Sequence, residues 1–302
     1  MSKDLVFIAS GGRTGTQFLG DLLATIIEDC WSEHEADMFA GFNAKSWQRI
    51  QDFGLWHMVI GRALGQTGLR VAGTKFLTGE ADISKLAEKL RRQRSSYHAR
   101  IDENLVIESY WRWWMFSGEM AQIWPGAKTI GIIRDPKSWI SSWLAHDKSH
   151  SGTPWTYYFP PGPITPARIG DAEWTKRWNS LSPVGRLAWE WREIYRRIDA
   201  AAQSADNTMI FRFEDLFDRE TGAMERLVTF ASSHGGRQYH TGNVDDIMPS
   251  VRNASSNRKD AWKSWSNQDK AIVDELCGPW MDKYGYAQMA IASPVRESSL
   301  AL

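Results

Sequence analysis

A short stretch near the amino terminus, residues 10–19, combines residue types that bind oxyanions. It follows an apolar run at 5–9, opens on two glycines, and continues with apolar residues at helical spacing. A strand, a glycine turn and a helix N-terminus in this order leave the first helical N–H groups unpaired, and the helix dipole adds positive partial charge there. An arginine and two threonines add a cation and two hydroxyls. Two interpretations stay open: a site for a phosphate-like ligand, or a turn that only joins a strand to a helix.

The stretch differs from the P-loop of nucleotide hydrolases. That pattern ends in Gly-Lys-Ser/Thr, whereas here the cation is Arg13, which precedes the last glycine, Gly15, and no lysine follows. We therefore expect it to bind a phosphate-like group without ordinary ATP hydrolysis.

Composition narrows the class of protein. The 302 residues carry 36 basic and 36 acidic side chains, so a nucleic-acid partner held by bulk charge is not expected. The two cysteines, Cys30 and Cys277, lie far apart and show no metal-ligand spacing, which favours a reduced compartment and no metal site. No run of about 18 apolar residues and no signal peptide is present. We expect a cytoplasmic protein without a transmembrane segment.

Predicted strands and helices alternate along the chain. Strands are expected at 5–9, 70–77, 104–109, 128–133 and 208–213, and helices at 80–94, 110–124, 184–202, 224–233 and 267–284. Such alternation indicates parallel βαβ units, so we predict an α/β fold, a three-layer sandwich whose central parallel sheet is flanked by helices. A single domain is expected over residues 1–302, with an aromatic-rich insertion or lid at about 146–183.

Residues from distant parts of the sequence converge on one edge of this predicted sheet. In an open parallel sheet the ligand lies beyond the carboxyl ends of the strands. Four side chains stand at or just beyond predicted strand ends, namely Arg13, Lys75, Glu108 and Arg134. Their convergence favours a functional site over a purely structural turn.

Four segments together resemble the sulfotransferases that use 3′-phosphoadenosine 5′-phosphosulfate (PAPS). Residues 12–19 resemble the family's 5′-phosphosulfate loop, usually Pro-(Arg/Lys)-Ser-Gly-Thr-Thr, although Gly12, Thr14 and Gln17 replace its proline, serine and second threonine. Residues 133–142 are similar to the 3′-phosphate motif. Residues 211–216 resemble the strand that commonly reads Tyr-Glu-Asp-Leu, and residues 258–286 the basic loop and closing Gly-Tyr.

The resemblance implies a P-loop NTPase-like sulfotransferase fold. It is nearer to the carbohydrate, tyrosyl-protein and bacterial branches than to the cytosolic phenol and steroid enzymes. Those enzymes carry Lys-Thr-His at an early strand end, whereas Phe76 and Leu77 follow Lys75 here.

The resemblance also implies PAPS as co-substrate and assigns residues to it. The 5′-phosphosulfate would lie in a loop made of Gly12, Arg13, Thr14, Gly15, Thr16 and Gln17. The 3′-phosphate would be held by Arg134, Ser142 and either Arg258 or Lys259. Phe18 stands where the family often places a tryptophan against the adenine, and a plain core phenylalanine is the alternative.

An attacking hydroxyl must lose its proton, so the reaction requires a general base. Glu35 is the first choice, because several members of the superfamily carry a catalytic glutamate beyond the first helix and His-Glu-Ala-Asp here is similar to their His-Glu-Pro. His34, Glu33 and Glu108 are the alternatives. By the same resemblance, Lys75 would stabilise charge on the bridging oxygen.

The expected activity is in-line transfer of a sulfuryl group to a hydroxyl of a small-molecule, carbohydrate or glycolipid acceptor. A nucleotide-dependent kinase or NTPase is the alternative, against which the missing Gly-Lys-Ser/Thr and the absence of an obvious Mg²⁺ carboxylate count. A catalytically silent binding protein is a third hypothesis. Some of the 17 tryptophans could line an acceptor pocket, but the sequence identifies neither the acceptor nor the oligomeric state.

Overall fold

The computed structural model describes residues 3–38, 43–146, 161–244 and 260–289. Five parallel strands form one sheet in the order β2-β3-β1-β4-β5. Their bounds are β1 Asp4–Ser10, β2 Cys30–His34, β3 Leu105–Ser109, β4 Lys128–Ile133 and β5 Thr208–Arg212. A separate two-stranded hairpin pairs β6 (Ser233–His234) with β7 (Arg237–Gln238).

β1 lies in the middle of the sheet and is buried on both faces. Successive side chains of a strand point to opposite faces, so Val6 and Ile8 belong to one core and Phe7 and Ala9 to the other. A strand covered on both sides reads as a continuous apolar run rather than an alternating one, as residues 5–9 do.

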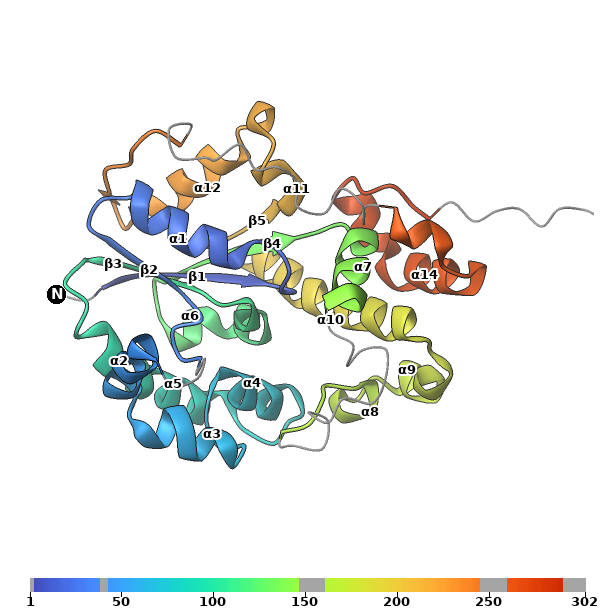
Figure 1. Cartoon of the computed structure of the whole chain (residues 1–302), viewed down its shortest axis with the longest axis horizontal. Coiled ribbons are helices and arrows are strands. Elements are labelled where there is room, and N and C mark those ends of the chain that lie inside the picture. The colour runs from blue at the N-terminus through green and yellow to red at the C-terminus, as the bar shows by residue number, and fades with distance from the viewer. Residues whose placement is uncertain (1–2, 39–42, 147–160, 245–259, 290–302) are drawn as a thin grey trace, which may run out of the picture.

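Helices cover both faces and complete the predicted three-layer α/β sandwich (Figure 1). One face is covered by α1 (Thr16–Ile26), α11 (Phe213–Leu216) and α12 (Ala223–Ser232). The other is covered by α4 (Leu69–Leu77), α5 (Ile83–His98), η2 (Trp111–Glu119), α6 (Met120–Ile123), α7 (Pro136–His146), α10 (Pro183–Ser204) and α14 (Asn267–Lys283). Beside β2 and β3 lie α2 (Ala44–Phe53), η1 (Trp56–Ile60) and α3 (Gly61–Ala63), and two short 3₁₀ helices are η6 (Arg219–Thr221) and η8 (Ala261–Ser264).

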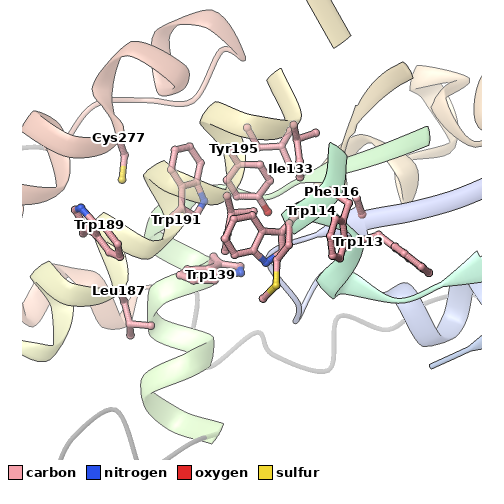
Figure 2. Close-up of a cluster of buried hydrophobic side chains, with 14 of the residues drawn as sticks. Trp113, Trp114, Phe116, Ile133, Trp139, Leu187, Trp189, Trp191, Tyr195 and Cys277 are labelled. Atoms are coloured by element: carbon pink, nitrogen blue, oxygen red, sulfur yellow. The ribbon is translucent and has the colours of Figure 1, made fainter. Parts of the chain in front are cut away.

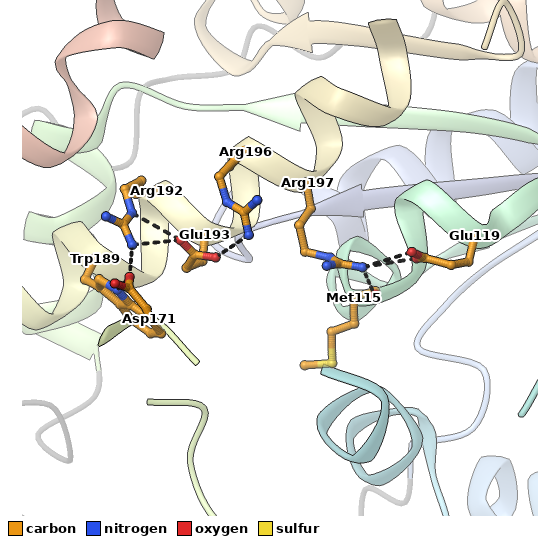
Figure 3. Close-up of polar contacts among 8 residues, drawn as sticks. All are labelled: Met115, Glu119, Asp171, Trp189, Arg192, Glu193, Arg196 and Arg197. Atoms are coloured by element: carbon orange, nitrogen blue, oxygen red, sulfur yellow. Dashed lines mark hydrogen bonds and ion pairs between the residues drawn. The ribbon is translucent and has the colours of Figure 1, made fainter. Parts of the chain in front are cut away.

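Tryptophan makes up much of the larger core. Figure 2 shows aromatic side chains from η2, α7 and α10 packed together, and Trp113, Trp139, Trp189 and Trp191 are fully buried. α10, the longest helix, also carries a polar side on which arginines pair with carboxylates (Figure 3). There Arg192 contacts Asp171 and Glu193, and further along Arg197 binds Glu119.

The described part of the predicted insertion consists of short helices packed on α10. They are α8 (Pro166–Ile169), α9 (Ala172–Arg177) and η5 (Trp178–Ser180). Trp174 is buried, and Trp178 makes an edge contact with Trp189, so these two aromatics pack on the body of the protein. The aromatic residues predicted to line the lid at 155–159 lie outside the described residues.

One strand predicted from the sequence is wrong, and one observed strand was not predicted. Residues 70–77, expected as a strand ending near Lys75, form helix α4, which buries Leu69, Val71, Gly73 and Thr74. Cys30–His34, for which no strand was predicted, forms edge strand β2 paired to β3.

The tryptophan-rich segment also differs from the expected α-helix at 110–124. It forms a 3₁₀ helix, η2, followed by the single α-turn of α6. Side chains 113–117 are all buried, and five consecutive buried positions do not fit one face of an α-helix.

No helix in the described ranges is long and apolar enough to cross a bilayer. Both cysteines are buried and unpaired, and burial raises the pKa of Cys30 to about 12.

Gly131 in the central strand β4 allows close approach of α10. A Cβ at this position would collide with Ile198 and would crowd Ile210 at 3.1 Å. We predict that Gly131→Ala destabilises the protein by about 1–3 kcal/mol, as overpacking of a core does. Denaturant unfolding measures this effect, and Gly118→Ala is the control, because a Cβ there meets nothing within 4 Å. Equal stability of the two variants would contradict the prediction.

Candidate active site at the carboxyl edge of the sheet

The turn after β1 is built for close backbone approach. Gly12, Arg13 and Gly15 have φ values of 72°, 55° and 72°, in the left-handed region that favours glycine. α1 then begins at Thr16 with no side-chain cap on its first N–H groups. These orphan donors and the helix dipole together form an anion cradle.

The indoles of Trp139 and Trp143 bind the backbone carbonyls of this turn. Trp139 Nε1 donates to the carbonyls of Gly11 (3.2 Å) and Gly12 (3.0 Å), and Trp143 Nε1 donates to Gly11 (3.3 Å). A Cβ on Gly11 would stand 2.8 Å from the Trp139 nitrogen, so a larger residue would displace the indole. The carbonyls of Gly11 and Gly12 are thus bound within the protein, and the N–H of Gly12 donates to Ser10 Oγ at 3.1 Å. The N–H groups that remain for a ligand are those at the start of α1.

Side chains of the turn divide into inward and outward ones. Thr14 is fully buried, and its hydroxyl donates to Ser10 Oγ at 2.8 Å. Thr14 therefore stabilises the turn from inside the protein. The sequence-based prediction that its hydroxyl contacts the ligand is not supported by this position. Arg13 and Gln17 are exposed, whereas Thr16 is buried and its carbonyl accepts a 2.5 Å bond from Ser109.

Arg134, just beyond β4, reaches the same turn. Its Nη1 donates to the carbonyl of Arg13 at 2.5 Å, its Nε donates to Ser138 Oγ at 3.0 Å, and its guanidinium lies 4.7 Å from the Phe213 ring centre. Burial lowers the pKa of Arg134, with partial opposition from Glu214, but a guanidinium stays charged. The structure thus brings Arg13 and Arg134, 121 residues apart in sequence, into direct contact.

Two serines on the first turns of α7 accept hydrogen bonds from these arginines. Ser142 Oγ accepts a 3.3 Å bond from Nε of Arg13, not from Arg134, which the sequence had paired with Ser142. The serine on Arg134 is Ser138, which sequence reasoning missed. Arg134 lies between β4 and α7, so its side chain reaches Ser138 on the first turn of that helix.

Aromatic rings form a wall on the other side of the turn. Phe18 is half-buried and packs on Phe217, with ring centres 5.3 Å apart, and Phe217 packs in turn on Phe213. A Cβ on Gly15 would lie 3.3 Å from both Phe213 and Phe217. Phe18 therefore contacts the core and also borders the anion cradle.

Glu35 stands directly beyond β2, at the same edge of the sheet. Its N–H donates to Ser109 at the end of β3, and its φ of 52° turns the chain away from the strand. His34 Nε2 lies 3.8 Å from the Glu35 carboxylate. Burial lowers the pKa of His34, although the Glu35 charge partly opposes this, so the imidazole is neutral near pH 7.

The other two candidate bases are engaged elsewhere. Glu33 accepts hydrogen bonds from Arg49 (3.1 Å) and the Tyr97 hydroxyl (2.8 Å). Glu108 is buried, and both of its oxygens bind Arg94 while one also contacts His98. Its expected position at an accessible strand end is therefore wrong, since the side chain points into the layer beneath β2 and β3.

Lys75 is not at the sheet edge, contrary to the prediction. On helix α4 it lines a cavity of about 620 Å³ together with Lys89, Arg92 and Trp56, and no residue of the turn after β1 lines that cavity. Arg258 and Lys259 lie outside the described residues. Among the described residues, no group of three or more His, Cys, Asp or Glu side chains could hold a metal ion.

Comparison with known proteins identifies the family. The sequence profile described as "Sulfotransferase domain" matches residues 3–275, nearly the whole chain. The chain belongs to the sulfotransferase family. A search of curated protein sequences finds no match.

Several solved structures are similar to this sulfotransferase. A sulfotransferase domain from the curacin biosynthetic pathway is 13% identical over 96% of this chain and 99% of that one, with a TM-score of 0.43. A sulfotransferase from Alicyclobacillus acidocaldarius is 14% identical over 92% and 97%, with a TM-score of 0.43. Mouse sulfotransferase SULT7A1 complexed with PAP is 14% identical over 93% and 86%, with a TM-score of 0.45. At these scores the likeness adds no weight, and the assignment rests on the family profile.

Family membership supports sulfuryl transfer as the activity and confirms the resemblance to sulfotransferases. The kinase or NTPase alternative is not favoured.

A buried charge network holds the segment that carries Glu35 in this sulfotransferase. Arg94 is fully buried and lies 3.6 Å from Asp37, whose other partner is His57 at 3.3 Å. Although burial opposes it, Arg94 and His57 hold the pKa of Asp37 well below its usual range. The backbone carbonyls of this segment are bound by two more arginines: Arg62 binds the carbonyl of Asp37, and Arg49 those of His34 and Met38.

Arg94 compensates two buried carboxylates, Glu108 and Asp37. We predict that Arg94→Met destabilises the protein by about 3–5 kcal/mol, because removing one partner leaves buried charge without compensation. The free energy of unfolding from denaturant titration measures the loss. Arg226→Met is the matched control, since Arg226 is exposed and, among the described residues, its side chain donates to the Thr221 carbonyl. A loss under 1 kcal/mol for Arg94→Met would show that the network does not depend on it.

Proposed function

We propose that this sulfotransferase takes its sulfuryl group from PAPS and transfers it to a hydroxyl of a small-molecule, carbohydrate or glycolipid acceptor. The observation that carries the proposal is the contact between Arg134 and the backbone of Arg13. It places two guanidiniums at the exits of adjacent strands, as a donor with anionic groups at both ends of one adenosine requires.

The turn after β1 would hold the 5′-phosphosulfate. The uncapped N–H groups at the start of α1 and the exposed guanidinium of Arg13 would neutralise the phosphate that leaves as the S–O bond breaks. Gly12 and Gly15 allow the close approach, while Thr16 and Gln17 stand at the first positions of the helix. Sulfuryl transfer resembles phosphoryl transfer here, in that positioning and charge stabilisation dominate.

The 3′-phosphate would lie at Arg134. Its Nε and Nη1 are held by Ser138 and the Arg13 carbonyl, so the guanidinium is fixed in orientation before a ligand binds. Ser142 stands one turn further along α7 and would supply a hydroxyl. We retain Arg258 or Lys259 as further partners of this phosphate, and Phe18 as the face for the adenine.

Glu35 would take the proton of the acceptor hydroxyl. It stands beyond β2, two strand spacings or roughly 10 Å along the sheet edge from the exit of β1. An acceptor lying in front of β3 would place its hydroxyl between Glu35 and the sulfuryl group. His34 is the second candidate, because its neutral imidazole also faces Glu35. Lys75 has no role in this mechanism, since α4 carries it into a different cavity.

The donor assignment is tested by thermal melting with two nucleotides. Adenosine 3′,5′-bisphosphate (PAP), the desulfonated donor, should raise the melting temperature, and Mg-ATP should not. Arg134→Ala should weaken PAP binding by about 2 kcal/mol, roughly 30-fold, through loss of charge-assisted hydrogen bonds. Arg226→Ala, which removes an exposed arginine of α12 whose side chain bonds the Thr221 carbonyl, should bind PAP as the parent does. Stabilisation by Mg-ATP but not by PAP would refute the assignment.

The base assignment is tested by Glu35→Gln. This variant should keep its affinity for PAP and lose turnover by roughly 10²–10⁴, the usual contribution of a general base. Glu28→Gln is the control, because Glu28 is an exposed carboxylate that precedes β2 at the opposite edge of the sheet. If Glu35→Gln turns over as fast as the parent, the base is another residue, and His34→Gln is the next variant to measure.

A further inference from the structure

Two half-buried arginines next to the candidate active site have no acidic partner. Neither Arg70 nor Arg112 forms a hydrogen bond or salt bridge with any described residue. By contrast, the nearby Arg49, Arg62 and Arg94 are all bound to carboxylates or carbonyls. Half-buried guanidiniums left without a counter-charge are costly, and this directs attention to what would neutralise them.

The packing of α4 on η2 brings the two arginines together. Gly73 of α4 lies directly against Met115 of η2, where a Cβ would collide with the sulfur; Figure 3 shows the Met115 side chain extending from η2. Arg70 precedes Gly73 by three residues and so shares its helical face. Arg112 precedes Met115 by three residues, and in a 3₁₀ helix such side chains eclipse.

The charges of the two guanidiniums also act on each other. Burial lowers the pKa of Arg70, and the charge of Arg112 lowers it further, with only the Tyr110 hydroxyl group acting in the opposite sense. Arg112 is in turn fixed over the ring of Trp111 at 4.0 Å. The fold thus holds two like charges within electrostatic range of each other, an arrangement that a bound anion would stabilise.

The chain segment that precedes Arg112 contacts both the anion cradle and Glu35. Trp111, on which Arg112 stacks, would be 3.4 Å from a Cβ on Gly12. Tyr110 precedes Trp111 in the sequence and follows Ser109, whose carbonyl accepts a hydrogen bond from the N–H of Glu35. These contacts connect the segment that carries Arg112 to both proposed reaction partners.

We propose that Arg70 and Arg112 bind an acidic group of the acceptor, namely a carboxylate, a phosphate monoester or a sulfate monoester. The inference rests on the proposed function and names its substrate class: a hydroxyl compound that already carries negative charge. Paired guanidiniums offer several fixed N–H donors to one oxyanion and would orient the acceptor so that its hydroxyl faces the sulfuryl group.

The test measures acceptor binding to protein saturated with PAP, so that the donor cradles are filled. Isothermal titration uses three matched pairs of an acid and its neutral counterpart: methyl glucuronide and methyl glucoside, glucose 6-phosphate and glucose, 4-hydroxyphenylacetate and tyrosol. At least one acid should bind about tenfold tighter than its counterpart or more, as charge-assisted hydrogen bonds allow. Arg70→Gln and Arg112→Gln should each abolish this preference and leave the affinity for PAP unchanged.

Two controls keep the result specific. Arg226→Gln should retain the preference for the acid, and Arg70→Lys should restore part of it if charge rather than packing is responsible. The inference is overturned if the parent prefers none of the three acids, if the preference survives both glutamine variants, or if those variants lose PAP affinity instead, which would assign the pair to the donor. Failure of the parent to bind PAP would refute the proposed function, and the same titrations on the unliganded protein would still report the anion preference.

Discussion

The contact between Arg134 and the carbonyl of Arg13 is the constraint on which the site depends. It joins the exits of two adjacent parallel strands, β1 and β4, and it fixes a guanidinium whose ends would otherwise be free to rotate. Parallel strands alone would only place these residues on the same edge. The hydrogen bond, together with Ser138 on Nε, sets their distance and orientation before any ligand arrives.

Tryptophan has a structural role in this arrangement beyond filling the core. The indoles of Trp139 and Trp143 bind the carbonyls of the turn, and Trp191 donates to the carbonyl of Arg134 at 3.0 Å. Each ring is apolar except for one N–H, so it can pack in the core and still satisfy one backbone acceptor. The loop that would bind the donor is therefore anchored by the core of α7 and α10, and the uncapped N–H groups at the start of α1 stay available.

The layer beneath β2 and β3 differs from the rest of the core in that it contains buried ion pairs. Glu33 and Glu108 occupy paired positions on these strands where apolar residues would be expected, and arginines from α2 and α5 neutralise them. The same arginines bind Asp37 and the carbonyls of His34 and Met38, so the segment around Glu35 is held by charges and hydrogen bonds. Arg70 and Arg112 do not take part in this network, because neither forms a hydrogen bond or salt bridge with a described residue.

The layered α/β fold, the turn after β1 and the place of Arg134 could be predicted from the residues alone, because they depend on local patterns: an apolar run, a glycine turn and a β-branched strand ending in arginine. Strand β2, helix α4 and the partners of Glu108 depend on contacts between distant segments and became clear only from the folded chain. Residues 30–34 become a strand by pairing with β3 about seventy positions later, and residues 69–77 become a helix by packing Gly73 on Met115. Glu108 looks accessible in sequence, yet Arg94 and His98 of α5 enclose it. A local pattern fixes which residues alternate or recur, whereas pairing and burial depend on segments that meet only in the folded chain.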